Sequence, residues 1–292
     1  MMERPVARCS WFQVSGPRSQ VLALRGKTIG LIGAGNMGQA LITGLRAAGV
    51  ASGRLRVVES NPAIRRRVSR RHRVVMTTLE QVARRCDVVI VAVKPQDIRP
   101  VLEQLASGLH AHRRRALVIS IAAGVTLTAL ERILGRTAVI RVMPNLPAKV
   151  GCGISVTVAG RFATSFHRTL ARAIFACVGE VVELPERLFD VVTAISGSGP
   201  AYFFAIFQAL RDAGVRQGLP KAVAQRLAVR TALGSAQLVD RLREDVDALI
   251  AQVASKRGTT EAALKVFRQR HLARIIEAGV FAATRRSQEL SR

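Results

Sequence analysis

The sequence predicts an α/β fold in which a doubly wound sheet is followed by an all-α domain. From Thr28 to Leu184, short apolar and β-branched runs alternate with segments of helical spacing, a pattern typical of a parallel sheet covered by helices. From Pro185 onward the strand-like runs disappear, and helical segments follow one another to the end of the chain. Their broad apolar faces predict dimerisation.

A glycine-rich string lies between the first predicted strand, Thr28–Ile32, and the first predicted helix, Gln39–Ala48. Its GxGxxG spacing in this context is typical of Rossmann-type dinucleotide-binding domains. The first glycine permits a tight turn, the second lets the backbone approach a pyrophosphate, and the third lets the helix pack on the strand. We therefore predict a pyrophosphate site on Gly33, Ala34, Gly35, Asn36, Met37 and Gly38.

Further elements of the first domain are predicted in chain order. The strands span residues 54–59, 74–76, 87–93, 116–121, 137–142, 154–158 and 181–184, and the helices span 79–85, 126–134 and 162–178. Ligands of such sheets bind beyond the carboxyl ends of the strands. Lys94 and Pro95 follow one strand and Ala122, Ala123 and Gly124 follow another, so we expect ligand contacts there.

The second predicted strand ends at Glu59, about twenty residues after the glycine string. An acid at this position binds the adenosine ribose diol and favours NAD. Ser60, Asn61 and the following Arg65–Arg67 offer instead a site for the 2′-phosphate of NADP. These residues therefore do not decide between NAD and NADP as the cofactor.

Three segments divide the chain. Residues 1–26 are expected to be a disordered tail or the product of a mis-assigned start, residues 27–184 the dinucleotide-binding domain, and residues 185–292 the all-α domain for substrate binding and dimerisation. Predicted helices of the last segment cover 188–195, 201–215, 220–239 and 246–253, and a further one begins at Thr259. The sequence Ser196-Gly197-Ser198-Gly199-Pro200 is expected to break the first of them.

Composition excludes several function classes. The net charge of +26 raises the possibility of nucleic-acid binding, but one Trp and one Tyr supply almost no stacking aromatics, so we expect no nucleic-acid partner. Four cysteines and five histidines lack metal-ligand spacing, so no metal is expected. The cysteines are scattered, which predicts unpaired thiols and a reducing cytoplasm. No uninterrupted apolar run is long enough for a membrane span, so no membrane partner is expected.

Six separated strings of this chain resemble pyrroline-5-carboxylate reductase, from about Thr28 to Leu290. They read IGLIGAGNMGQALI, VAVKPQD, ISIAAGVTL, RVMPNLPAKVGCG, VVTAISGSGPAYFFAIFQALRDAGVRQGLPKAVA and SKRGTTEAAL. The resemblance implies reduction of 1-pyrroline-5-carboxylate to L-proline, the last step of proline biosynthesis, with NADP as the cofactor and NAD as a possible one. It also implies a homodimer, or a higher oligomer of dimers, and a small imino acid as substrate.

The same resemblance implies roles for particular residues. The nicotinamide would meet Val93, Lys94, Pro95 and Ala122–Gly124, and Asn145 would shape the pocket. The substrate carboxylate would bind Gly258, Thr259 and Thr260 with Ser255 nearby, while Thr193 would face the ring nitrogen. Because Gly258-Thr259-Thr260 also opens a predicted helix, its N–H groups suit a carboxylate on physical grounds.

The chain departs from the family pattern at several positions. Leu146 replaces a threonine, Lys256-Arg257 replace Pro-Gly, Leu79 stands where an asparagine is expected, and Arg243 stands where an acid is expected. Two alternatives follow: a divergent, inactive paralogue that binds nucleotide, or a related imine or 3-hydroxyacid dehydrogenase. The latter enzymes keep a catalytic lysine on a helix of the second domain, and Lys221 and Lys265 do not lie in such a motif.

Overall fold

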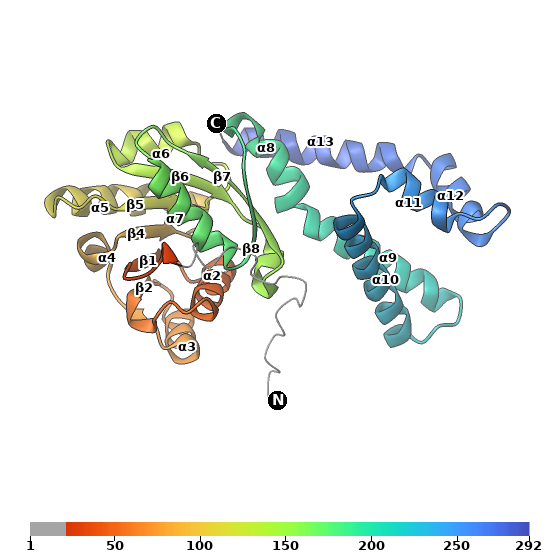
Figure 1. Cartoon of the computed structure of the whole chain (residues 1–292), viewed down its shortest axis with the longest axis horizontal. Coiled ribbons are helices and arrows are strands. Elements are labelled where there is room, and N and C mark those ends of the chain that lie inside the picture. Colours follow the sequence, from red (N-terminus) through yellow and green to blue (C-terminus); the bar gives the residue numbers. More distant parts are fainter. Residues whose placement is uncertain (1–21, 292) are drawn as a thin grey trace. The chain divides into compact units, whose positions relative to one another are not determined.

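The computed structural model of the chain describes residues 22–291. These residues form two compact units (Figure 1). The first unit extends to Ser198 and takes in the chain again from Ala283, and the second unit is Gly199–Ala282. The sheet ends close to the predicted boundary at residue 184, but the first unit continues beyond it because residues 186–198 and the last turns of the chain pack with the sheet domain.

An eight-stranded sheet forms the centre of the first unit, in the order β3-β2-β1-β4-β5-β6-β7-β8. The strands are β1 (Ile29–Ile32), β2 (Leu55–Val58), β3 (Val75–Met76), β4 (Val88–Val91), β5 (Leu117–Ser120), β6 (Ala138–Met143), β7 (Gly153–Ala159) and β8 (Gly179–Glu183). All were predicted within a few residues. The first six strands are parallel to one another, as a doubly wound sheet requires.

The expectation of a wholly parallel sheet is wrong at its far edge. Strand β7 pairs antiparallel with β6, and β8 then pairs parallel with β7. A short 3₁₀ turn, Leu146–Val150, joins β6 to β7, and such a short link cannot carry the chain back across the sheet as a parallel crossover would require. Apolar runs alone do not give strand direction, so the sequence could not show this reversal.

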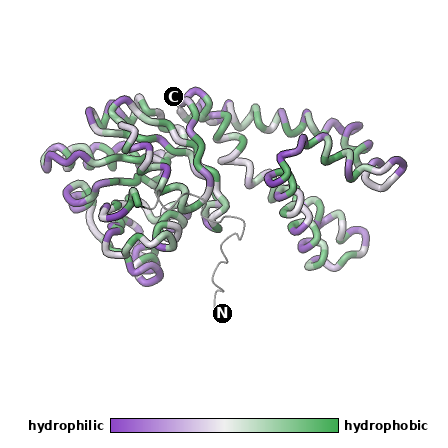
Figure 2. Tube along the Cα trace, in the orientation of Figure 1, coloured by the Kyte–Doolittle hydropathy of each residue, from purple (hydrophilic) through white to green (hydrophobic). Residues whose placement is uncertain are grey.

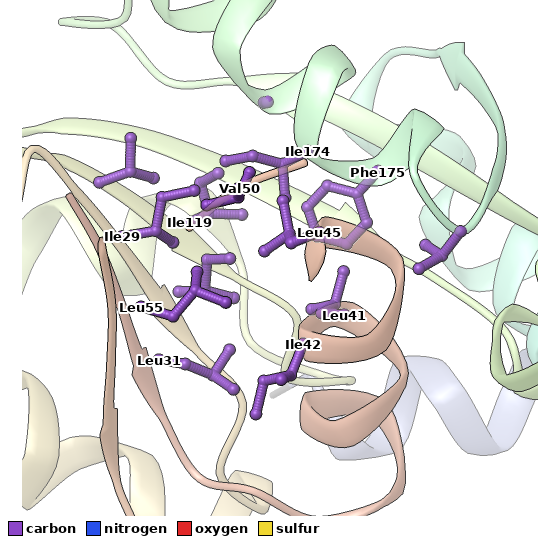
Figure 3. Packing of buried hydrophobic residues seen from close by; sticks show 14 of the residues in the cluster. Ile29, Leu31, Leu41, Ile42, Leu45, Val50, Leu55, Ile119, Ile174 and Phe175 are labelled. Carbon is purple, nitrogen blue, oxygen red and sulfur yellow. The ribbon is translucent and has the colours of Figure 1, made fainter. Parts of the chain in front are cut away.

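Six helices of the first unit pack on the two faces of this sheet: α2 (Asn36–Ala47), α3 (Pro62–His72), α4 (Leu79–Arg85), α5 (Ile98–Ala111), α6 (Leu127–Leu134) and α7 (Ser165–Ala176). One core cluster joins the sheet to α2 and α7 through residues such as Leu41, Leu45 and Phe175 (Figure 3). A second cluster joins the other face to α4, α5 and α6 through Val82, Leu102 and Leu130.

Two of these helices, α3 and α5, were not predicted. Helix α3 buries only Val68 and is otherwise dominated by arginine, so it lacks the apolar periodicity that reveals a helix. Pro100 lies in the first turn of α5, where proline is tolerated although it resembles a break in the sequence. At the N-terminal end, residues 1–21 of the predicted tail lie outside the described residues, but Leu24 is buried in the first core cluster and so is not part of a disordered tail.

The predicted break at Ser196–Pro200 is observed as an interruption of the α-helix by a π-helical turn and a bend, and not as a complete break. The chain runs from a 3₁₀ turn, Glu186–Leu188, through α8 (Phe189–Val192) into a π-helical turn, Thr193–Gly197, and on into α9 (Gly199–Arg216). The Ser198 N–H donates to the Thr193 carbonyl, the i→i−5 bond of a π turn. Gly197 lies close to Met143, since a Cβ on it would lie 2.6 Å from the Met143 methyl group and that side chain would have to shift.

The second unit contains helices only, as predicted. It comprises most of α9, then α10 (Lys221–Leu242), α11 (Val246–Val253), α12 (Thr259–Gln269) and the greater part of α13 (Leu272–Leu290). Apolar residues recur along these helices (Figure 2), and large side chains including Phe203, Leu227, Ile275 and Phe281 are exposed. Such extended exposed apolar surface is typical of a helical unit that associates with another protein chain.

One helix, Glu186–Arg216, is long and apolar enough to cross a membrane by length and composition, and 22% of its most hydrophobic window is buried. It contains the π turn and begins with Glu186. The Glu186 Oε1 atom accepts from the Arg141 guanidinium at 2.8 Å and from the Leu127 N–H at 2.7 Å. The first end of this helix is therefore fixed to the sheet domain.

Replacing Arg141 by methionine should lower the free energy of unfolding by about 2 kcal/mol, because a buried ion-pair partner is removed and Glu186 loses its counter-charge. The side chain of Arg141 is only 5% exposed, and its guanidinium also stacks on the Phe189 ring at 4.7 Å. Urea denaturation measures the change. Arg132→Met, at an exposed position of α6, is the matched control, and equal stability of the two variants would contradict the prediction.

Candidate active site

The glycine string lies directly beyond the carboxyl end of β1, where the sequence places it. Gly33 has φ +96°, and a Cβ there would lie 2.6 Å from the Ala92 carbonyl oxygen, so only glycine fits. A Cβ on Gly38 would lie 2.4 Å from the Gly33 carbonyl oxygen. These two glycines therefore allow β1, the loop and α2 to pack closely, which is what the motif predicts.

Gly35 differs from the other two glycines because a Cβ there would meet nothing within 4 Å. It is exposed and is the N-cap residue of α2, and no side chain among the described residues caps this helix. The first-turn N–H groups of α2, which begins at Asn36, thus have no capping side chain among the described residues. Open backbone at a helix N-terminus is the geometry that fits a pyrophosphate. The observed helix begins three residues before the predicted one.

Glu59 lies beyond the end of β2, beside the glycine string. Its Oε2 atom accepts from the Ala34 N–H and its Oε1 atom from the Asn61 N–H, each at 2.8 Å. Asn61 in turn caps α3, because its Oδ1 atom accepts from the N–H groups of Ala63 and Ile64. Ser60 is exposed, as are Arg65, Arg66 and Arg67 on the first turns of α3. The side chains of Glu59 and Asn61 thus stabilise the backbone between β2, the glycine string and α3.

The predicted nicotinamide contacts lie at the same edge of the sheet. Val93, Lys94 and Pro95 follow β4, and Ala122–Gly124 follow β5. Lys94 and Pro95 are exposed, Val93, Ala123 and Gly124 are half-buried, and Ala122 is buried. A Cβ on Gly124 would lie 2.9 Å from the Leu290 carbonyl oxygen, so the end of α13 packs against this loop. The sequence did not predict that contact.

The side chains of Asn145 and Thr193, both in the first unit, make hydrogen bonds to the backbone. The Asn145 Oδ1 atom accepts from the Ile154 N–H at 2.9 Å and so fixes the turn between β6 and β7. The Thr193 hydroxyl donates to the Phe189 carbonyl at 2.7 Å, which leaves its oxygen able to accept a further bond. The contact between Gly197 and Met143 links the π turn to the end of β6.

The predicted carboxylate site lies in the second unit. Helix α12 begins at Thr259 with Gly258 as its N-cap residue, and no side chain of the described residues caps it. A Cβ on Gly258 would lie 2.4 Å from the Ser255 Oγ atom, so the Ser255 side chain lies next to the start of α12. Thr260 is half-buried, and the Arg257 N–H donates to the Glu261 carboxylate. This helix start has the free N–H groups and the threonine side chains that a carboxylate requires.

The residues that depart from the family pattern differ in burial and in position. Leu79 is buried in the second core cluster as the first residue of α4, so it serves packing. Leu146 is exposed at the start of the turn between β6 and β7. Arg243 ends α10 with φ +53°, and Lys256 is exposed before α12. Nothing in the structure explains the choice of leucine at residue 146.

Within residues 22–291, the other reactive groups described here lie apart from one another. Burial raises the pKa of the Cys86 thiol to about 12, so this residue is no nucleophile near neutral pH. The Tyr202 hydroxyl is buried without a partner in the described part of the chain. Among residues 22–291, no group of three or more His, Cys, Asp or Glu side chains could hold a metal ion.

Comparison with known proteins identifies the family of this chain. The chain is 40% identical over 266 residues to a pyrroline-5-carboxylate reductase of Synechocystis, with 90% of this chain and 98% of the relative covered. The chain belongs to the pyrroline-5-carboxylate reductase family. A reductase of this name from Mycobacterium leprae is 39% identical over 282 residues, covering 90% of this chain and 96% of the relative.

Two family models match different parts of the chain, and solved structures match most of its length. Residues 186–290 match the model for pyrroline-5-carboxylate reductase dimerisation, and residues 28–124 match that for NADP oxidoreductase, coenzyme F420-dependent. A pyrroline-5-carboxylate reductase structure from Coxiella burnetii has a TM-score of 0.84 at 34% identity, covering 91% of this chain and 99% of that one. The Plasmodium falciparum enzyme, solved with NADP bound, has a TM-score of 0.83 at 28% identity, with coverages of 91% and 99%.

These comparisons confirm the predicted family and fold class. They give the chain a Rossmann-like nucleotide domain, an oxidoreductase function and a helical region of the kind that associates in this family. The roles of the individual site residues stay predictions.

Proposed function

We propose that this chain reduces 1-pyrroline-5-carboxylate to L-proline with NADPH as the preferred hydride donor and NADH as a possible one. The observation that carries the proposal is that similarity to pyrroline-5-carboxylate reductases extends over 90% of the chain. Both helix starts that lack a capping side chain among the described residues lie within the residues that the family models match. Bound at the glycine string, the nicotinamide nucleotide supplies the hydride. The chain's own residues then have to bind and orient the two reactants.

The proposed substrate is a cyclic imine that carries a carboxylate and is already protonated. Such an imine needs no enzymic acid to accept a hydride, so orientation supplies most of the rate. We assign the carboxylate to the start of α12, with Thr259 and Thr260 and with Ser255 beside them. Thr193, whose oxygen is free to accept, is assigned to the ring N–H, and Asn145 shapes the pocket through the turn that it fixes.

The hydrogen bonds that Glu59 accepts support a preference for NADPH. Both of its carboxylate oxygens already accept backbone N–H groups, so the carboxylate is less available to the ribose diol that would favour NADH. The exposed Arg65–Arg67 of α3 and Ser60 supply positive charge and a hydroxyl for a 2′-phosphate. We propose Glu59 as a residue that holds the loop and Ser60 as the contact.

The experiment that tests the function is steady-state oxidation of NADPH and NADH with racemic 1-pyrroline-5-carboxylate. Turnover with production of proline, and a higher kcat/KM for NADPH, is expected. Nucleotide binding without turnover would favour the inactive paralogue. Turnover of a 3-hydroxyacid but not of the imine would favour the related dehydrogenase.

Replacing Arg65, Arg66 and Arg67 together by glutamine should lower kcat/KM for NADPH about tenfold and leave that for NADH unchanged, because charge-assisted bonds to the 2′-phosphate are lost. The control is the double variant Arg132→Gln, Arg172→Gln, which removes exposed arginines from α6 and α7. An equal loss with both nucleotides would show that these arginines do not distinguish them.

For the assembly, we propose a cytoplasmic homodimer, or a higher oligomer of dimers, formed through the helical region. The exposed apolar side chains of α9, α10 and α13 would then be covered by a second copy, and the helix Glu186–Arg216 would pack on protein rather than lipid. We propose neither nucleic acid nor a membrane as a partner.

A further inference from the structure

A cavity of about 810 Å³ lies on the first unit, away from the proposed nucleotide edge. Its lining contains Ala116 and Thr137, the residues that precede β5 and β6. Because β1, β4, β5 and β6 are parallel, the amino ends of β5 and β6 lie at the opposite edge of the sheet from the glycine string. The cavity is therefore separate from the edge that holds the nucleotide.

Antiparallel strand β7 brings a further segment to this cavity. It ends at Ala159, and the Gly160 N–H donates to the Val139 carbonyl near the start of β6. The residues that follow, including Phe162, Thr164 and His167, thereby reach the same edge. Three segments distant in sequence contribute to the lining: the loop before β5, the loop before β6 and the approach to α7.

The lining is strongly basic. It holds four arginines and two histidines and contains no carboxylate; these residues are Arg113, Arg114, Arg115, Arg136, His110 and His167. Asp87 lies near the lining and pairs with Arg114 at 3.3 Å. Arg113, Arg115 and Arg136 have no carboxylate within salt-bridge distance among the described residues. No acidic side chain of the lining therefore offsets the repulsion between these positive charges.

Several groups of this lining are held in place by the fold. The Arg136 guanidinium lies over the Phe162 ring at 5.9 Å from its centroid, and Arg161 lies over the same ring at 4.6 Å. The His167 Nδ1 atom accepts from the Thr164 N–H at 3.1 Å, so the neutral ring carries its proton on Nε2 and can donate it. Arg113 follows the end of α5 with φ +49°.

We propose that this cavity is a second anion-binding site, for a soluble compound that carries several linked phosphate groups. Guanidinium groups form paired hydrogen bonds with phosphate oxygens, and one phosphate could meet only one or two of the four. A chain of phosphates could meet arginines from both loops. The cavity volume is within the range of small-ligand sites. Phe162 is the one Phe, Tyr or Trp of the lining, which gives little support for stacking successive bases of a nucleic acid.

The test uses inorganic tripolyphosphate and the full chain saturated with NADP⁺, so that the glycine string is occupied. Isothermal titration should detect one site per chain. The variant Arg113→Gln, Arg115→Gln, Arg136→Gln should weaken binding by at least tenfold and make its dependence on salt concentration less steep. Its kcat/KM for the imine should be unchanged, because these residues lie outside the proposed catalytic and nucleotide sites.

A triple variant with the same loss of charge is the control: Arg132→Gln, Arg172→Gln, Arg274→Gln, whose positions are exposed and outside the cavity lining. It should bind tripolyphosphate like the parent chain. Equal weakening in both triple variants would show general attraction to a basic protein and would overturn the proposal. Unchanged binding in the cavity variant, no binding in the parent chain, or preferential binding of single-stranded DNA over tripolyphosphate would overturn it as well.

Discussion

Replacing Gly35 by alanine should raise the Kd for NADPH about a hundredfold and leave the thermal midpoint of the apo chain unchanged. The structure has open space where the new Cβ would go, so the fold has no reason to change. The same methyl group would stand where we propose that the pyrophosphate approaches the backbone. Loss of one or two hydrogen bonds to a charged group costs about 1.5–3 kcal/mol each, and 1.4 kcal/mol corresponds to a factor of ten in affinity.

Two other glycines serve as controls for this result. Gly53→Ala also adds a methyl group in open space, far along the chain from the string, and should change neither quantity. Gly38→Ala places a Cβ 2.4 Å from the Gly33 carbonyl oxygen and should lower both affinity and thermal midpoint. If Gly35→Ala binds NADPH normally by fluorescence titration, the pyrophosphate does not approach at this residue.

Replacing Thr260 by alanine should raise KM for 1-pyrroline-5-carboxylate by about ten- to a hundredfold while the Kd for NADPH stays the same. The hydroxyl is proposed to donate to the substrate carboxylate, and a charge-assisted hydrogen bond contributes about 1.5–3 kcal/mol. The backbone of α12 should keep its start, because Gly258 and not Thr260 is its N-cap residue. Initial rates over a range of imine concentrations give KM, and fluorescence titration gives the Kd for NADPH.

Thr169→Ala is the matched control. It removes a threonine hydroxyl from an exposed position of α7, where that hydroxyl donates to the Ser165 carbonyl. It should leave KM unchanged. Wild-type values of both KM and kcat in Thr260→Ala would place the carboxylate elsewhere, and a parallel loss of NADPH affinity would indicate a general defect of the chain.

Much of the fold could be predicted because most of its elements carry their own local signal. Strand β4 is a continuous run of valine and isoleucine, and α6 and α12 begin after Thr126 and Gly258, residue types common before a helix. Helix α3 carries no such signal, since its arginine-rich sequence lacks an apolar face. The direction of β7 depends on the turn that precedes it, which hydrophobicity does not describe.

The candidate site shows the same division. The positions of Gly33 and Gly38 follow from a short motif in which close backbone approach demands glycine. The engagement of Glu59 with Ala34 and Asn61 and the packing of Leu290 on Gly124 depend on residues that are distant in sequence. The basic cavity is of this second kind, because its loops come together only after β7 reverses direction.

The π turn at Thr193–Gly197 has a consequence for the angular phase of the helix that contains it. A π turn accommodates one more residue than an α turn, and each α-helical residue advances by about 100° around the axis. Deleting one residue there would let the segment relax to ordinary α-helix. The turn would then hold one residue fewer for the same rotation, so the side chains of α9 would keep their present azimuth. Deleting one residue within the α-helical part of α9 would instead turn every later side chain by about 100° around the axis.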